Sequence, residues 1–205
     1  MKILFVLCLF AGLFWFIIFS PWTFGRFNFW VEMMMATGVL AGAALFSGKK
    51  DLPSVYRFQR SHLVIGIVSA AVLYLVFLIG DAISTQSFSF AKPEVSSIYR
   101  SREQASTLII GILLFFWIGP AEEVFWRGFV QRRLSKRFGE LRGYLVSSLI
   151  YAGVHIWAFN LMLFLAALIC GLFWGGLFKR YRSVWPVLIS HAVWDVAIFI
   201  LFPIL

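Results

Sequence analysis

Long apolar runs alternate with short polar segments along the chain. A helix needs about 20 predominantly apolar residues to cross a bilayer, and most of the runs are close to that length. They predict about seven transmembrane helices, within a range of six to eight. The expected helices cover approximately residues 3–19, 27–46, 63–79, 105–137, 144–159, 161–178 and 184–205, and in the fourth of them the apolar run passes into the basic stretch 131–137. No small-residue cleavage site follows the first run, so we expect it to remain as a membrane anchor.

This pattern predicts an all-α fold, a polytopic transmembrane helical bundle. Hydrophobic residues make up 61% of the chain and charged residues 13%, whereas about a quarter of the residues in soluble domains are charged. We expect a single integral membrane domain over residues 1–205. Within it, residues 1–104 would hold the N-terminal spans and a polar surface loop at 81–104, and residues 105–205 would form the catalytic helical core.

The basic residues lie in short clusters between the apolar runs. The formal net charge is +9, but such clusters act as topology signals, so we expect no nucleic-acid partner. With the N-terminus inside, four basic residues would face out, namely Arg26, Lys92, Arg100 and Arg102. The basic residues on the cytoplasmic side would be Lys2, Lys49, Lys50, Arg57, Arg60, Arg132, Arg133, Lys136, Arg137, Arg142, Lys179, Arg180 and Arg182. This asymmetry predicts a cytoplasmic N-terminus. We expect the protein to be integral to a membrane, namely a bacterial plasma membrane.

Charged residues interrupt the fourth apolar run at Glu122, Glu123 and Arg127. A charge at mid-bilayer costs roughly 2.5 to 3.5 kcal/mol on the lenient insertion scales, so such residues are usually paired, turned inward and functional. The i, i+4 spacing pairs Glu123 with Arg127, and this pair is more typical of a structural ion pair than of direct chemistry. Glu122 lies about 140° from Arg127 around the helix. We therefore expect Glu122 to be available as a general base for water.

Two later apolar runs carry polar pairs with the same spacing, Tyr151 with His155 and His191 with Asp195. Residues four apart stack on one face of a helix, so the pairs can converge on a shared pocket. Two histidines can orient a water molecule, carry a proton and donate to an oxyanion. Together with a free glutamate, these residues indicate hydrolytic chemistry.

Other hydrolytic mechanisms have less support in the sequence. The chain contains no G-x-S-x-G motif for a serine nucleophile, and no H-E-x-x-H motif. Its two cysteines, Cys8 and Cys170, lie in apolar runs, where we expect neither a disulfide nor a reactive thiol. We expect no cofactor, although zinc bound by Glu122, His155 and His191 stays open, because catalytic zinc needs three protein ligands and separate helices can supply them.

Three motifs in this order resemble the CPBP family of intramembrane proteases. They are Glu122-Glu-x-x-x-Arg127, Tyr151-x-x-x-His155 and His191-x-x-x-Asp195. The family includes the type II CAAX prenyl endopeptidase and bacterial proteins once called abortive-infection or bacteriocin-immunity proteins. The resemblance covers roughly residues 108–199. It implies a helical fold in the lipid bilayer, a glutamate-activated water, and cleavage of a membrane-embedded or lipid-anchored polypeptide.

The resemblance also implies a role for each motif residue. Glu122 and His155 would activate the water, and His191 with Asp195 would form the oxyanion site. The supporting residues would be Glu123, Arg127 and Tyr151. Asp195 stands where Asn is frequent in the family, and an ionised Asp cannot donate to an oxyanion. We expect Asp195 to orient His191 instead, as a carboxylate holds an imidazole tautomer.

Two other classes of function remain as alternatives. The same buried residues could relay protons in a channel or carrier, or the chain could be a non-catalytic immunity or scaffold protein of the membrane. Counting residues from the predicted helix ends, we expect the site to open toward the cytoplasmic half. The aromatic residues Phe24, Trp30, Trp126 and Trp174 are expected to face lipid or the membrane interface.

Overall fold

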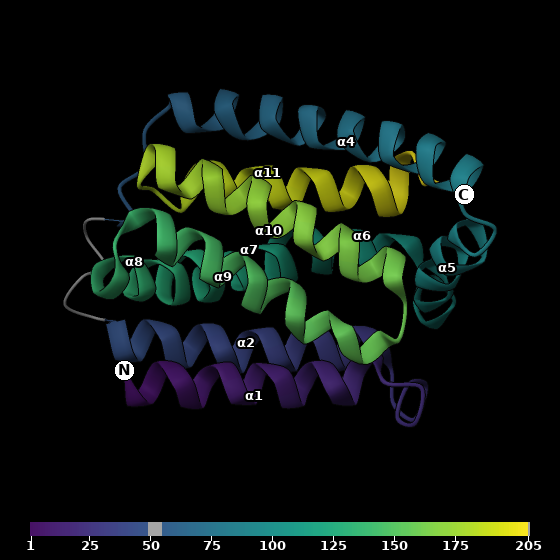
Figure 1. The fold of residues 1–205 in the computed structure, drawn as a ribbon, viewed down its shortest axis with the longest axis horizontal. Coiled ribbons are helices and arrows are strands. Elements are labelled where there is room, and N and C mark those ends of the chain that lie inside the picture. The colour runs from purple at the N-terminus through teal and green to yellow at the C-terminus, as the bar shows by residue number, and fades with distance from the viewer. Residues whose placement is uncertain (49–54, 205) are drawn as a thin grey trace.

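Helices account for all the regular structure in the part of the chain that the computed structural model describes, residues 1–48 and 55–204 (Figure 1). The predicted all-α fold class is confirmed. In chain order the elements are α1 (Lys2–Phe19), α2 (Phe29–Gly48), α4 (Ser61–Ser87), α5 (Ala91–Ile98), η2 (Tyr99–Gln104), α6 (Thr107–Leu113), η3 (Leu114–Ile118), α7 (Gly119–Phe125), η4 (Trp126–Gln131), α8 (Arg132–Phe138), α9 (Glu140–Val154), η5 (His155–Ala158), α10 (Leu161–Tyr181), α11 (Trp185–Val196) and η6 (Ala197–Leu201).

Each predicted apolar run corresponds to a helical segment. In the described residues, five segments are long and apolar enough to cross a membrane: Lys2–Phe19, Phe29–Ser47, Ser61–Ser87, Thr107–Phe138 and Leu161–Tyr181. The fourth of these is continuous from α6 to α8. Two shorter segments complete the set, α9 with 15 residues and the apolar helix Trp185–Leu201. The chain is thus an integral membrane protein built as a helical bundle.

Residues 81–104 are largely helical, so the predicted surface loop is wrong. Helix α4 continues to Ser87, and α5 and η2 follow it. The Trp30 Nε1–H donates to the Ser101 carbonyl oxygen at 2.8 Å, and the Met162 N–H donates to Glu94 Oε2 at 2.9 Å. These contacts tie the segment to α2 and α10. The segment is polar and lacks apolar periodicity, so its helices depend on tertiary contacts that the sequence pattern does not display.

The helix ends divide the bundle into two ends of different charge (Figure 1). The starts of α1, α4, α9 and α11, the end of α10, and α8 lie at one end, and α5 and the C-terminus lie at the other. We call the first the basic end because most described residues of the predicted cytoplasmic set belong to it: Lys2, Arg57, Arg60, Arg132, Arg133, Lys136, Arg137, Arg142, Lys179, Arg180 and Arg182. Lys49 and Lys50 lie outside the described residues.

A close helix crossing holds α4 against α11, which run side by side in Figure 1. A Cβ atom added at Gly66 on α4 would lie 2.6 Å from both Cβ and Cγ2 of Ile189 on α11. It would also lie 3.1 Å from the Pro186 carbonyl oxygen. Because small residues let membrane helices approach closely, Gly66 sets the separation of the two helices. The crossing positions the helix that carries His191 and Asp195.

We predict that Gly66→Ala lowers the stability of the protein in detergent by about 1 to 3 kcal/mol, because the new methyl group overlaps a branched side chain close to its own backbone. The matched control is Gly80→Ala on the same helix, where a Cβ atom would have no neighbour within 4 Å. Thermal unfolding should show a lower Tm for the first variant only. Equal Tm values for the two variants would contradict this packing argument.

Candidate active site

The two adjacent glutamates lie on α7, between the π-helical segments η3 and η4. Pro120 stands at the start of α7, and a proline has no N–H to donate to the preceding turn. Wide π turns inside α-helices are rare, and they occur frequently at functional sites. The local backbone is therefore unusual where Glu122 and Glu123 enter the bundle.

Glu123 forms the centre of a buried ion-pair network. Its Oε1 accepts from Arg127 Nη1 at 2.8 Å, so the ion pair that the spacing predicted is present. The same oxygen lies 2.7 Å from Nδ1 of His191 on α11. The Glu123 side chain is 0% exposed and that of Arg127 is 2% exposed. One carboxylate therefore links the fourth apolar segment to the last one.

Aromatic rings enclose the Arg127 guanidinium. Its Cζ lies 4.7 Å from the centroid of the Tyr151 ring and 5.6 Å from that of Trp174. Its Nη2 donates to the Cys170 carbonyl oxygen at 3.4 Å. Trp174 also stacks on the His191 ring, with centroids 3.7 Å apart and an interplanar angle of 24°. Cation–π contacts are strongest where water is excluded. The rings of Tyr151 and Trp174 therefore stabilise the charge of Arg127 in place of solvent.

His191 is held by carboxylates on both sides of its ring. Nδ1 faces Glu123, and Nε2 lies 3.5 Å from Oδ2 of Asp195. Asp195 in turn lies close to α7, where a Cβ atom added at Gly119 would be 3.3 Å from the same Oδ2. The shorter contact belongs to Glu123, so Glu123 dominates the orientation of the imidazole, while the expected orienting role of Asp195 stays a prediction.

His155 has both ring nitrogens engaged. Its Nδ1 lies 2.8 Å from the Tyr151 carbonyl oxygen, and its Nε2 accepts from the indole N–H of Trp15 at 3.1 Å. A carbonyl oxygen can only accept and an indole N–H can only donate. The two bonds therefore require a neutral imidazole with its proton on Nδ1. Trp15 belongs to α1 and is 0% exposed.

The three motifs meet around one cavity of about 440 Å³. The side chains around it include Glu122, Tyr151, His155, His191 and Asp195. Glu122 is buried, and its Oε2 has no hydrogen-bond partner among the described residues. Glu123 and Arg127 pack behind this lining, in contact with His191 and Tyr151. The motifs thus supply two carboxylates, one of them with an unpartnered oxygen, and two histidines to a shared space.

The cavity extends toward the end of the bundle opposite the basic end, and the membrane face that this end meets stays a prediction. Its lining includes residues of the turn after α1, of α5 and η2, and of the start of α10. At the basic end, α8 continues to Phe138, close to the predicted end of this helix, and α9 begins at Glu140.

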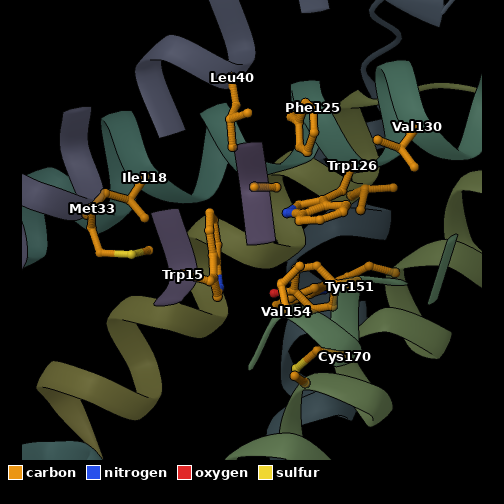
Figure 2. Packing of buried hydrophobic residues seen from close by; sticks show 14 of the residues in the cluster. Trp15, Met33, Leu40, Ile118, Phe125, Trp126, Val130, Tyr151, Val154 and Cys170 are labelled. Carbon is orange, nitrogen blue, oxygen red and sulfur yellow. The ribbon is translucent and has the colours of Figure 1, made fainter. Parts of the chain in front are cut away.

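Three tryptophans predicted to face lipid are buried beside the site. Trp30, Trp126 and Trp174 are 2%, 1% and 0% exposed. Figure 2 shows Trp15 and Trp126 close to Tyr151, and the ring centroids of Trp126 and Tyr151 are 5.3 Å apart. The prediction is therefore wrong for these three residues. Phe24, by contrast, is 36% exposed and lines the cavity.

The site does not fit a zinc ion bound by Glu122, His155 and His191. Among the described residues, no three side chains of His, Cys, Asp or Glu are grouped as metal ligands. His155 has no free nitrogen, because Trp15 and Tyr151 occupy both. Cys170 and Cys8 are free thiols, the first buried and the second half-buried. A metal ligand needs a lone pair directed at the ion, and His155 does not offer one.

Comparison with known proteins gives one match. Residues 104–197 match the family model of type II CAAX prenyl endopeptidase Rce1-like proteins. No curated protein and no solved structure matches the chain. The matched segment begins just before α6 and ends just after α11, so it contains all three motifs. Trp15, the hydrogen-bond partner of His155, lies outside it.

We predict that Glu123→Gln destabilises the protein by about 3 to 5 kcal/mol, because it leaves Arg127 buried without its countercharge. Glu122→Gln is the matched control, because Glu122 Oε2 has no partner to lose. Chemical denaturation in detergent micelles should separate the two variants clearly. If both lost the same stability, the network centred on Glu123 would not have the importance we assign to it.

We predict that Trp15→Phe exposes Nε2 of His155 and costs about 0.5 to 1.5 kcal/mol of stability, because one buried hydrogen bond is removed while the aromatic packing largely remains. Trp126→Phe is the control, since Trp126 Nε1 has no hydrogen-bond partner among the described residues. Modification by diethyl pyrocarbonate, mapped by mass spectrometry, should be faster at His155 in the first variant only. Unchanged modification of His155 in Trp15→Phe would argue against this bond.

Proposed function

Residues 104–197 belong to the Rce1-like family of type II CAAX prenyl endopeptidases, and on that premise we propose that this membrane protein is an intramembrane endopeptidase with Glu122 as its general base. Its substrate would be a membrane-embedded or lipid-anchored polypeptide. The observation that carries the proposal is the position of Glu122, a buried carboxylate with an unpartnered oxygen in the cavity that His191 and Asp195 also line.

The proposed reaction begins with a water molecule beside Glu122. The carboxylate takes a proton from the water as the water oxygen attacks the carbonyl carbon of the scissile peptide bond. The carbonyl oxygen becomes an oxyanion in a tetrahedral intermediate. When the C–N bond breaks, Glu122 returns the proton to the leaving amine. Atoms and charge balance without any further reactant.

His191 is the proposed donor to the oxyanion. Glu123 binds Nδ1 of the ring, so Nε2 is the nitrogen on the side of Asp195. Because Nδ1 donates its hydrogen to the Glu123 carboxylate, Nε2 carries a hydrogen only when the imidazole is protonated on both nitrogens. In that imidazolium form, the Nε2–H can donate to an oxygen that gains charge in the transition state, and a donor held in advance is worth more than a mobile one. The stack against Trp174 also restricts rotation of the ring. Asp195 would hold the same N–H in its direction between turnovers.

The role of His155 in the proposed reaction depends on its hydrogen bond with Trp15. It lines the cavity, but it can accept a proton or orient water through Nε2 only when the indole N–H of Trp15 leaves that nitrogen. Proton transfer is therefore assigned to Glu122, and His155 would help to place the water. Tyr151 supports both sides of the site, since its carbonyl oxygen binds His155 and its ring covers Arg127. We propose that the reaction needs no metal cofactor.

A proton-conducting function has weaker support. A channel or carrier needs a path to both membrane faces, but closely packed side chains lie between the cavity and the basic end. Phe125, Trp126 and Phe129 are each 1% exposed there. No residue of α8 or of the first half of α9 lines the cavity, so its lining traces no path to the basic end.

We predict that Glu122→Gln lowers peptide-bond cleavage by roughly 10²- to 10⁴-fold, because an amide cannot take the proton from water. Substrates would be found by comparing terminal peptides in membranes from cells that produce the wild-type protein or this variant. Cleavage would then be measured with the purified protein in micelles.

The control for this experiment is Glu32→Gln on α2, a glutamate in another membrane helix and outside the cavity lining. It should cleave the same substrates at the wild-type rate. If the Glu122→Gln variant folds normally and still cleaves them, Glu122 is not the base.

A further inference from the structure

A second hollow lies between the start of α9 and the end of α10, at the basic end of the bundle (Figure 1). Its volume is about 420 Å³. The residues that line it are Tyr144, Gly176, Lys179, Arg180 and Arg182. Three of them are cationic, and none is acidic. None of the five lines the cavity that contains Glu122, so the hollow is a separate feature to which the proposed function assigns no role.

A glycine and an anchored ring keep this hollow open. A Cβ atom added at Gly176 would lie 3.7 Å from the Tyr144 hydroxyl oxygen and 4.0 Å from the nearest atoms of its ring. A larger side chain at position 176 would therefore occupy the space beside the ring. The ring itself is held in place, because the Tyr144 hydroxyl donates to the Leu172 carbonyl oxygen at 3.1 Å.

The cations around the hollow retain most of their hydrogen-bonding capacity. Within the described part of the chain, the side chains of Lys179 and Arg180 make ring contacts but no hydrogen bond or ion pair. Lys179 Nζ lies 5.7 Å from the centroid of the Tyr144 ring. Arg182 Nη2 lies 3.6 Å from Glu140 Oε1. An ammonium carries three donors and a guanidinium five, so these groups have far more donors than one carboxylate can use.

The turn after α10 holds the third cation in place. Arg182 has a left-handed backbone conformation with a φ of 52°, which is uncommon for a residue of this type. Its N–H donates to the Phe178 carbonyl oxygen at 2.7 Å, and the Val184 N–H donates to the Val55 carbonyl oxygen at 3.0 Å. A helix dipole favours basic residues in the last turn. It explains neither the open space beside Tyr144 nor an arginine fixed beyond the end of the helix.

The surface beside the hollow is apolar. Leu141 and Leu145, in the first two turns of α9, are 57% and 41% exposed. Helix α10 is long and apolar enough to cross a membrane, so its last turn, with Lys179 and Arg180, lies at the edge of the bilayer. Lipid headgroups begin at that depth. The hollow therefore combines cations with a flanking apolar surface where headgroups and acyl chains meet.

From these observations we propose that the hollow binds the phosphate group of an anionic phospholipid. A phosphate diester offers acceptor oxygens and a negative charge, which match the unused donors of Lys179, Arg180 and Arg182. The lining has no carboxylate that could receive the cation of a zwitterionic headgroup. The acyl chains would lie along the exposed leucines of α9, a contact that a free phosphate ion cannot make. Binding at this place involves no peptide-bond cleavage, so the inference goes beyond the proposed function.

The test measures lipid binding to the purified protein by native mass spectrometry. Protein in detergent micelles is titrated with phosphatidylglycerol or with phosphatidylcholine of the same acyl chains. We expect phosphatidylglycerol to bind several-fold more tightly, and inorganic phosphate at the same concentration should not displace it. Equal binding of the two lipids would overturn the proposal. Displacement by an equal concentration of inorganic phosphate would overturn it too, because the ligand would then be a soluble phosphate.

Two double variants separate a built site from a general attraction to basic surfaces. Lys179→Gln with Arg180→Gln removes two charges from the lining and should weaken phosphatidylglycerol binding by roughly 10- to 30-fold. The matched control is Arg137→Gln with Arg142→Gln, which removes two exposed charges from the same end but outside the lining. It should weaken binding by no more than about twofold, because salt screens exposed charges at a distance. An equal loss in both would overturn the proposal, since net charge alone would then explain the binding.

Gly176→Leu tests the shape of the site without changing any charge. A Cβ atom makes only ordinary contacts at this position, so we expect the variant to fold, and the rest of the side chain should fill the hollow. Phosphatidylglycerol binding should fall to the level of phosphatidylcholine. Gly12→Leu on α1 is the control, because a Cβ atom there has no neighbour within 4 Å, and it should bind as the wild type does. Wild-type binding by folded Gly176→Leu would show that the lipid is held elsewhere.

Discussion

The buried carboxylate of Glu123 is the interaction on which the site depends. Within the apolar bundle it neutralises Arg127 on its own helix and binds His191 on α11. A lone charge in this environment is costly, whereas a paired and hydrogen-bonded one can be retained. The network therefore fixes the distance between the segment that carries Glu122 and the helix that carries His191 and Asp195. The rings of Tyr151 and Trp174 complete it by covering the guanidinium.

The neighbouring glutamates have different environments because adjacent positions in a helix point about 100° apart. Glu123 is directed into the network, while Glu122 is directed into the cavity, where Oε2 has no partner among the described residues. A structural carboxylate and a reactive one thus lie side by side in sequence. Glu123 Oε1 holds two helices together, although its Oε2 also has no partner among the described residues, and what distinguishes Glu122 is that it lines the cavity.

The part of the chain before residue 104 completes the site, although the family match lies outside it. Helix α1 contributes Trp15, whose indole N–H determines which nitrogen of His155 carries the proton. Helix α5 and the turn after α1 border the mouth of the cavity. The matched segment supplies the motif residues, and the N-terminal part contributes the indole that holds His155 and a share of the cavity lining.

The sequence by itself determined the helical membrane fold, the Glu123–Arg127 pair and the five motif residues among those that line the cavity, because apolar run length and i, i+4 spacing are local properties. Tertiary structure decided what depends on contacts between distant segments. Helices in residues 81–104 are tied to α2 and α10, Trp126 and Trp174 are buried rather than lipid-facing, and Glu123 is the nearer carboxylate to His191. The extent of the cavity also belongs to this group, because segments far apart in the chain line it together.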